Sequence, residues 1–243
     1  MKIGLLVPWG PGELTIEEHD TLFREVVRHP EVEILRVNKG KAAEGKAEVA
    51  FSMPDILKLI QQAERDGFDA VVVVCSAEPG VEEARYLVSI PVFGPTSIAL
   101  HTGLTIGHRV GVITSSQVTK SENLYTSRAC GLESFVSIES IDMTMTDIKA
   151  QRQEFKSGGK HVEVIDKMMA AGIKLIEEEN VSVLTLGCNA LTWFVDKVTE
   201  ELKKKGYDIP FVNPLPLAVR VAKNLAELGL THSRIMYPKV GNR

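Results

Sequence analysis

The sequence lacks any long uninterrupted apolar run, and it holds only three cysteines in 243 residues. A bilayer span needs roughly 18 apolar residues in succession, so we expect no membrane protein. The first apolar run, Ile3 to Val7, ends at Pro8 and is too short for a signal peptide. An odd number of widely spaced cysteines argues against a disulfide framework and suits a reducing compartment. We therefore expect a soluble, cytoplasmic protein.

A basic excess is also missing, because the formal net charge is -4. Binding to a phosphate backbone requires clustered positive charge, so we expect no nucleic-acid partner. The histidines and cysteines show neither H-E-x-x-H nor Cys-x-x-Cys spacing, which leaves a metal site without support. The G-x-S-x-G turn of serine hydrolases and the G-x-x-x-x-G-K-[ST] phosphate cradle are absent too. We expect no metal and no cofactor.

Short apolar runs alternate with longer amphipathic segments, which is typical of βαβ units around a parallel sheet. The expected strands are 3–7, 32–37, 70–74, 91–93, 110–113, 135–140, 181–186 and 210–212. The expected helices are 16–27, 53–66, 95–103, 120–130, 162–179, 191–204 and 215–228. The composition of residues 38–48 and 151–160 predicts two loops. The fold class is therefore α/β, with mainly parallel sheets flanked by helices.

The two halves of the chain repeat one order of features. Each half opens with an apolar strand, and at nearly the same distance along the chain a second apolar strand ends at a cysteine, Cys75 or Cys188. An Ile-Pro phrase then leads into a helix, at Ile90 in the first half and at Ile209 in the second. We infer two duplicated lobes. The first holds residues 1–96 and 214–243, and the second holds residues 97–213.

Ligands of open α/β sheets collect outside the carboxyl ends of the strands, which is where both cysteines lie. If a pseudo-twofold axis relates the lobes, Cys75 and Cys188 face each other across a cleft. One thiolate could then remove a proton next to a carbonyl while the opposite thiol delivers one, which inverts the carbon without a metal or cofactor. A helix N-terminus near each cysteine would favour the thiolate. The alternative is that both cysteines are small apolar core residues.

Polar residues at the same strand ends are candidates for holding a carboxylate or an imide. Ser76 and Asn189 directly follow the cysteines and precede expected helix starts, and Thr114 and Ser115 open a hydroxyl-rich turn of the kind that forms anion nests. Each could instead serve only as a helix cap. By the pseudo-symmetry, the loop after the first strand reaches the mouth of the cleft and offers an apolar wall. The candidate substrate-binding residues are Pro8, Trp9, Ser76, Thr114, Ser115 and Asn189.

At these residues the sequence resembles the aspartate/glutamate/hydantoin racemase superfamily over essentially the whole chain. Its two cysteine motifs and its second-lobe turn are matched by Val73-Val74-Cys75-Ser76, by Leu184-Thr185-Leu186-Gly187-Cys188-Asn189 and by Gly111-Val112-Ile113-Thr114-Ser115. The tail, from Pro216 to Ser233, is similar to the closing helix of the hydantoin racemase branch. The resemblance implies cofactor-independent racemisation, with Cys75 and Cys188 as the acid/base pair. It also implies that Ser76, Thr114, Ser115 and Asn189 hold the polar groups of the substrate.

The first loop departs from that pattern, because this chain has Val7-Pro8-Trp9-Gly10 where hydantoin racemases carry Asn-Pro-Asn and glutamate racemases Asp-Ser-Gly. Its opening strand looks more like the maleate isomerase and arylmalonate decarboxylase branches, although the decarboxylases lack a cysteine equivalent to Cys75. The expected function is a racemase or epimerase of an amino acid or a hydantoin-like derivative. Alternatives are a maleate-type cis-trans isomerase, an arylmalonate-type decarboxylase and a non-catalytic small-acid-binding protein. We also expect a homo-oligomer.

Overall fold

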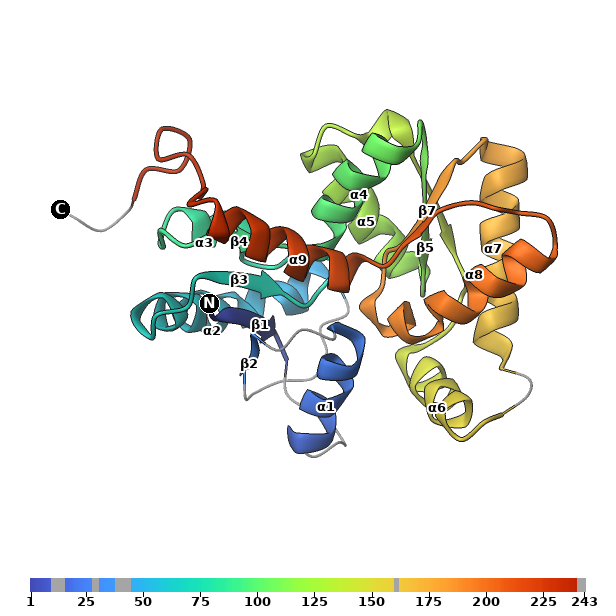
Figure 1. Cartoon of the computed structure of the whole chain (residues 1–243), viewed down its shortest axis with the longest axis horizontal. Coiled ribbons are helices and arrows are strands. Elements are labelled where there is room, and N and C mark those ends of the chain that lie inside the picture. Colours follow the sequence, from blue (N-terminus) through green and yellow to red (C-terminus); the bar gives the residue numbers. More distant parts are fainter. Residues whose placement is uncertain (10–15, 28–30, 38–44, 160–161, 240–243) are drawn as a thin grey trace. The chain divides into compact units, whose positions relative to one another are not determined.

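The computed structural model describes residues 1–9, 16–27, 31–37, 45–159 and 162–239 of the chain (Figure 1). The chain divides into two compact units. Unit 1 comprises Met1–Ile98 and Leu215–Arg243, and unit 2 comprises Ala99–Pro214. Each unit is built on a four-stranded parallel sheet flanked by helices, which confirms the expected α/β fold class.

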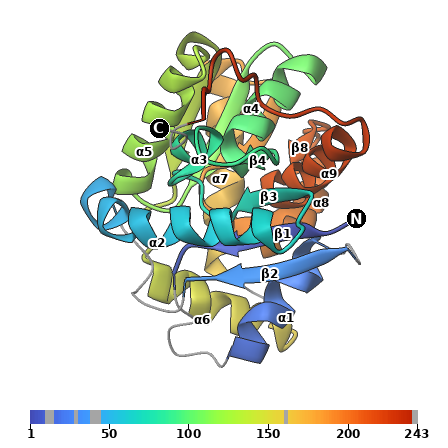
Figure 2. The same ribbon diagram turned by 90° about the vertical axis from the view of Figure 1, so that its left-hand side faces the viewer.

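Unit 1 has the strand order β2-β1-β3-β4. Its strands are β1 (Ile3–Val7), β2 (Val32–Arg36), β3 (Ala70–Val73) and β4 (Val92–Phe93). Its helices are α1 (Ile16–Val27), α2 (Lys46–Arg65), α3 (Val81–Arg85), the first turn of α4 (Pro95–Ile106) and most of α9 (Pro214–Glu227). Figure 2 shows α2 running along one face of this sheet.

Helices cover both faces of the unit 1 sheet. Ile3, Leu5 and Val7 point to one face and pack with buried residues of α1 and α9. Leu6 and the alternate residues of β3 point to the other face and pack with α2 and α3. Because successive side chains of a strand point to opposite faces, two apolar faces require a continuous apolar strand. This explains why β1 and β3 read as unbroken apolar runs.

Unit 2 has the strand order β6-β5-β7-β8. Its strands are β5 (Val110–Thr114), β6 (Val136–Ser140), β7 (Val183–Leu186) and β8 (Phe211–Val212). The rest of α4 is followed by α5 (Gln117–Ala129), the 3-10 turn η1 (Glu133–Phe135), α6 (Met145–Lys156), α7 (Glu163–Glu179), the 3-10 helix η2 (Asn189–Phe194) and α8 (Val195–Lys204). Residues of α7 and α8 pack with Ile113, Leu184 and Leu186, whereas Leu100 of α4 packs with Val110 and Val112.

The two sheets share one topology and one register. β1 pairs with β3 from Ile3 opposite Ala70, and β5 pairs with β7 from Val110 opposite Val183. The ladder continues equivalently past each strand end, because Val74 N donates to the carbonyl of Leu6 at 2.7 Å and Gly187 N donates to that of Ile113 at 2.8 Å. The repeated order of features in the sequence is thus a repeat of sheet topology, and the next residue in each unit is a cysteine.

Several expected boundaries are wrong. The loop predicted at 151–160 is helical up to Lys156, because α6 spans Met145–Lys156, whose sparse apolar residues give little helical periodicity. α2 begins at Lys46 rather than at 53. Proline is common in the first turn of a helix, so Pro54 favoured a start at 53, but the helix continues through it. The rest of the loop predicted at 38–48 lies mostly outside the described residues. α3 and η1 were not predicted. Within the described chain, no helix has the length and apolar character needed to cross a membrane.

Candidate active site

Cys75 lies two residues beyond the end of β3, at the carboxyl edge of the unit 1 sheet, and it is partly exposed. Its carbonyl accepts a hydrogen bond from Glu78 N at 3.0 Å, which closes a turn directly after the cysteine. The helix expected to start after Ser76 is therefore displaced, because α3 begins only at Val81. A turn, rather than a helix, follows the first cysteine.

Ser76 is buried, with 8% of its surface exposed, and its hydroxyl has no hydrogen-bond partner among the described residues. Its carbonyl accepts a hydrogen bond from Thr96 Oγ1 at 2.9 Å. Thr96 belongs to the first turn of α4, so the helix N-terminus next to Ser76 is that of α4. Buried polar side-chain atoms are normally paired. The hydroxyl of Ser76 is therefore a candidate for contact with a ligand.

Glu78 ties the turn after Cys75 to the same first turn of α4. It has a positive φ of 53°, and its Oε1 accepts a hydrogen bond from Ser97 N at 2.6 Å. Burial raises the pKa of the Glu78 carboxyl, while the hydrogen bonds from Ser97 and the charge of Arg85 oppose that rise. Gly94 makes this arrangement possible, because a Cβ at that position would overlap with the Glu78 side chain. Neither residue was predicted from the sequence to take part in the site.

Pro8 and Trp9 directly follow β1, which pairs with β3 in parallel, so they lie at the same edge of the sheet as Cys75. Pro8 is buried and Trp9 is partly buried. The indole of Trp9 packs against the apolar cluster that β1 and β3 form with α1 and α9. Part of the ring thus serves the core of unit 1.

Cys188 occupies the equivalent position in unit 2, two residues beyond the end of β7. It is buried, with 8% exposure, and it immediately precedes η2. Its Sγ lies 3.9 Å from Sδ of Met145, the first residue of α6. The second cysteine is therefore packed among apolar side chains near α6, whereas the first lies in a more exposed turn. None of the three cysteines forms a disulfide bond.

Asn189 follows Cys188 and is also buried, at 8% exposure. Neither its amide nitrogen nor its amide oxygen has a hydrogen-bond partner among the described residues. The residue thus carries one unpaired donor group and one unpaired acceptor beside a cysteine, as the hydroxyl of Ser76 does in unit 1. Leaving such groups unpaired costs about 1–3 kcal/mol each, which favours a role in binding over a role in stability.

Thr114 ends β5 and Ser115 follows it, and together they form the expected hydroxyl-rich turn, which Ser116 closes as the N-cap of α5. Thr114 Oγ1 lies 2.8 Å from Thr119 Oγ1 and 3.1 Å from the carbonyl oxygen of Gly187. Ser115 Oγ lies 3.2 Å from the same hydroxyl of Thr119. Both side chains are buried. The hydroxyl of Thr114 therefore holds β5 against the segment that carries Cys188.

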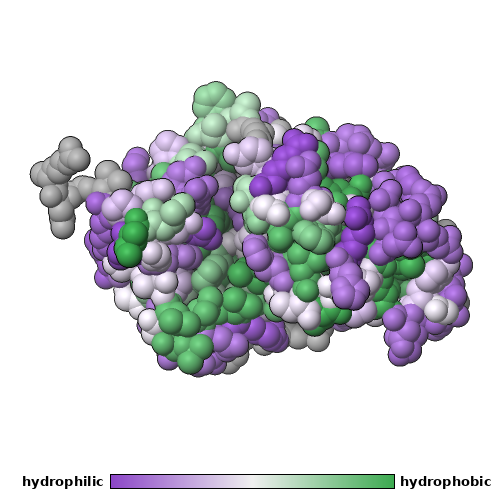
Figure 3. Space-filling view, turned by 90° about the horizontal axis from the view of Figure 1, so that it is seen from above, coloured by the Kyte–Doolittle hydropathy of each residue, from purple (hydrophilic) through white to green (hydrophobic). Residues whose placement is uncertain are grey.

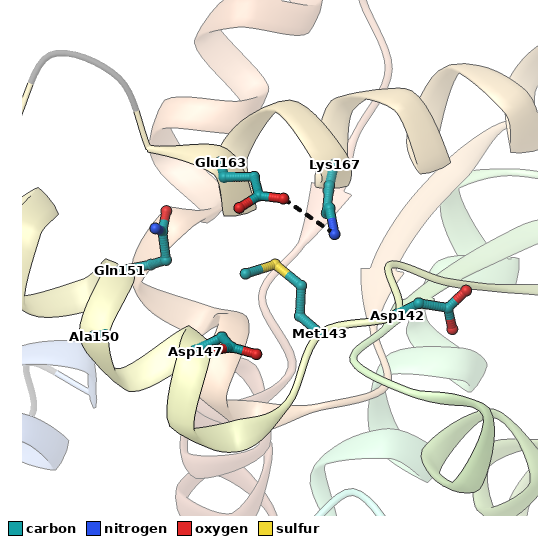
Figure 4. Close-up of a pocket in the computed structure, with 7 residues that line it drawn as sticks. All are labelled: Asp142, Met143, Asp147, Ala150, Gln151, Glu163 and Lys167. Carbon is teal, nitrogen blue, oxygen red and sulfur yellow. Dashed lines mark ion pairs between the residues drawn. The ribbon is translucent and has the colours of Figure 1, made fainter.

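A cavity in unit 2 is lined by residues of α6, of α7 and of the segment between β6 and α6. Its lining residues are Asp142, Met143, Asp147, Ala150, Gln151, Glu163 and Lys167. Figure 4 shows Glu163 paired with Lys167, at 3.2 Å, and the carboxyl group of Asp142 pointing away from Met143. Three carboxylates against one lysine make this cavity unfavourable for an anion. Within the described ranges, no three His, Cys, Asp or Glu side chains are grouped to hold a metal ion.

Comparisons with known proteins bear on the whole chain. A family model described as Asp/Glu/Hydantoin racemase matches residues 18–222. A hydantoin racemase from Rhizobium meliloti is 24% identical over 253 residues, which cover 99% of this chain and 96% of that protein. An allantoin racemase from Klebsiella pneumoniae has a similar fold, with a TM-score of 0.82 at 20% identity over 100% of this chain and 94% of the other. An allantoin racemase structure from Pseudomonas fluorescens gives a TM-score of 0.82 at 21% identity, over 100% and 98%.

Proposed function

We propose, from the premise that this chain belongs to the Asp/Glu/Hydantoin racemase family and is an isomerase, that Cys75 and Cys188 invert a carbon next to a carbonyl. The observation that supports this most directly is the equivalence of the two cysteines. Each lies two residues beyond the second of two central, paired strands in a sheet of the same topology. Carboxyl ends of parallel strands are where α/β proteins bind their ligands.

In the proposed reaction the two cysteines act on opposite faces of one carbon. The thiolate of one cysteine takes the proton, and the electron pair of the broken C–H bond moves onto the adjacent carbonyl. The thiol of the other cysteine then donates its proton to the opposite face, which restores the carbonyl and inverts the centre. The cysteines have exchanged protonation states at that point. Turnover of the other enantiomer, or exchange with water, restores the first state, and neither a metal nor a cofactor takes part.

We infer that the substrate is a hydantoin-like ring rather than a free amino acid. The buried amide of Asn189 offers one donor group and one acceptor without protein partners among the described residues, and Ser76 offers a hydroxyl. A ring imide presents N–H donors next to C=O acceptors and would satisfy both ends of such an amide. The hydantoin and allantoin racemases named above support the same class. Ser115 would add a hydroxyl, Thr114 would hold the turn, and Pro8 and Trp9 would form an apolar wall.

The proposal is tested by proton NMR in deuterated water with separate enantiomers of a 5-substituted hydantoin, allantoin and an amino-acid panel. Neither cysteine can replace its partner across the substrate plane, so Cys75→Ala and Cys188→Ala should each stop inversion. Each variant should still exchange the α-proton of one enantiomer, and the two variants should differ in which enantiomer that is. Cys130→Ala is the matched control and should behave as the parent. Racemisation at the parental rate in either single variant would refute the paired-thiol mechanism.

We further propose that the protein is a homo-oligomer. Large apolar side chains are exposed after α9, at Leu228, Leu230, Ile235 and Met236, and Ile235 is 96% exposed. Figure 3 shows hydrophobic residues exposed among hydrophilic ones on the face that it displays. Light scattering coupled to size-exclusion chromatography should give a mass at least twice that of one 26.7 kDa chain. A mass of one chain at all concentrations would refute this proposal.

A further inference from the structure

Asn123 of α5 contacts the backbone immediately before Cys188. It is 1% exposed, and its amide nitrogen donates to the carbonyl of Gly187 at 2.8 Å and to that of Thr119 at 2.7 Å. Two carbonyl acceptors identify this end of the amide as nitrogen, because an oxygen there would face two other oxygens. The amide oxygen is buried and has no hydrogen-bond partner among the described residues.

The absence of a side chain at Gly187 leaves room for the amide of Asn123. A Cβ at this position would lie 2.6 Å from Nδ2, 2.7 Å from Cγ and 2.8 Å from Oδ1 of Asn123. These distances are far shorter than van der Waals contact. Gly187 is not among the residues with positive φ, so the position does not require glycine for its backbone conformation. The glycine serves the close approach of Asn123 to the main chain.

The carbonyl of Gly187 therefore accepts from two side chains, the amide of Asn123 and the hydroxyl of Thr114 at 3.1 Å. Gly187 N also donates to Ile113, which completes the restraint of this residue. A trans peptide is planar and holds its C=O and N–H on opposite sides. Fixing the Gly187 carbonyl toward α5 thus fixes the plane of the Gly187–Cys188 peptide, and with it the position from which the Cys188 side chain starts.

We propose that Asn123 is a positioning residue for Cys188: by holding the Gly187 carbonyl, it aims the thiol along the line on which the proton is transferred. This inference rests on the proposed function of Cys188. The unpaired acceptor of Asn123 supports it, because a residue kept for stability alone would be expected to satisfy both ends of a buried amide. In unit 1, Val74 rather than a glycine stands at the position equivalent to Gly187. The effect should therefore be confined to one cysteine.

Backgrounds that keep only one of the two cysteines proposed to transfer protons give the decisive test. Asn123→Ala is introduced into Cys75→Ala, where only Cys188 exchanges protons, and into Cys188→Ala, where only Cys75 does. Exchange of the α-proton of a 5-substituted hydantoin should slow about 10- to 100-fold in the first background, because small misplacements of a reacting group cost rates of this order. In the second background it should change less than about twofold. Ser127→Ala is the matched control, since Ser127 is equally buried on α5 and its hydroxyl donates to the carbonyl of Leu124 in its own helix.

A second pair of variants separates positioning from folding. Gly187→Ala should displace the amide of Asn123 and cause the same loss as Asn123→Ala. Gly187→Ala combined with Asn123→Ala has room for the new methyl, so its fold should recover while its exchange rate should not fall further. Additive losses would overturn the inference, as would an equal loss in both cysteine backgrounds or a comparable loss in Ser127→Ala.

Thiol reactivity tests the inference even if no substrate exchanges. Iodoacetamide labelling, resolved by peptide mass spectrometry, reports Cys188, Cys75 and Cys130 separately in one protein. Asn123→Ala should change the labelling rate of Cys188 by at least about threefold, because reactivity follows the local environment of the thiol. The rates of the other two cysteines should stay unchanged. A parental rate at Cys188 would refute the positioning role, whereas a changed rate without any exchange would refute only the proposed racemisation.

Discussion

Gly94→Ala tests how the turn that carries Cys75 is anchored. The added methyl would overlap with Cγ, Cδ and Oε1 of Glu78, so the Glu78 side chain must leave its place. The hydrogen bond from Ser97 N to Glu78 Oε1, at 2.6 Å, is then lost. This bond links the turn after Cys75 to the first turn of α4, beside the bond from Thr96 Oγ1 to the carbonyl of Ser76.

The magnitude follows from two destabilising contributions and one that offsets them. A hydrogen bond to a charged group contributes about 1.5–3 kcal/mol, and forcing a methyl into a filled site costs about 1–3 kcal/mol. Against these, the displaced carboxylate regains water, which removes the burial that raises its pKa. The net loss in the free energy of unfolding should be about 1–3 kcal/mol, or a melting temperature lower by about 3–10 °C.

Thermal unfolding measures the global loss, and amide hydrogen exchange of the peptide that holds Ser97 measures the local one. The global loss should be partly recovered in Gly94→Ala combined with Glu78→Ala, because the methyl then meets no carboxylate, whereas the protection of Ser97 should stay low because its acceptor is gone. α-Proton exchange through Cys75 should fall in the single variant, since Glu78 N also bonds the carbonyl of Cys75. An unchanged melting temperature together with unchanged protection of Ser97 would refute the anchoring role.

Three further predictions concern charge and binding. Glu78→Gln keeps an acceptor for Ser97 but removes the titratable carboxyl. Because burial raises the pKa of Glu78 above 4.5, the parent should lose stability relative to this variant as pH rises from about 4.5 through the raised pKa. The same difference in melting temperature between parent and variant at every pH from 4 to 8 would contradict this. Burial, with Arg85 and Arg234 nearby, lowers the pKa of His232 to about 4. As pH falls from 6.5 to 4, the parent should therefore lose about 1–2 kcal/mol of its free energy of unfolding relative to His232→Gln, a magnitude reduced because the ring is partly exposed. Urea unfolding at each pH measures this loss. Asn189→Ala removes an amide with no partner among the described residues, so kcat/KM should fall about 10- to 100-fold while stability should stay the same or rise; a large loss of stability would assign Asn189 to the core.

The helices that the sequence misplaced share a physical cause. α6 buries only Ile148 and Arg152 among its twelve residues, so its apolar spacing is too sparse to be recognised. One local signal was present, because Thr144 and Asp147 form a capping box in which Asp147 N donates to the Thr144 hydroxyl at 3.1 Å. In the early turns of α2, the apolar Phe51 is exposed instead of buried, so the spacing of apolar residues there does not mark a buried helix face. α6 thus depends on its cap and local bonds rather than on a broad buried face.

The amino-acid order by itself determines the eight strands, the repeated strand topology and the place of Cys75 and Cys188 two residues past a buried strand. Strands that are covered on both faces must be apolar throughout, and this constraint is local enough to be read along the chain. The contacts of Asn123 with Gly187 and of Glu78 with Gly94 and Ser97 were decided only by the tertiary structure. A polar side chain that bonds a distant backbone group leaves no periodic pattern, because its partner is fixed by the packing of whole elements rather than by its neighbours in sequence.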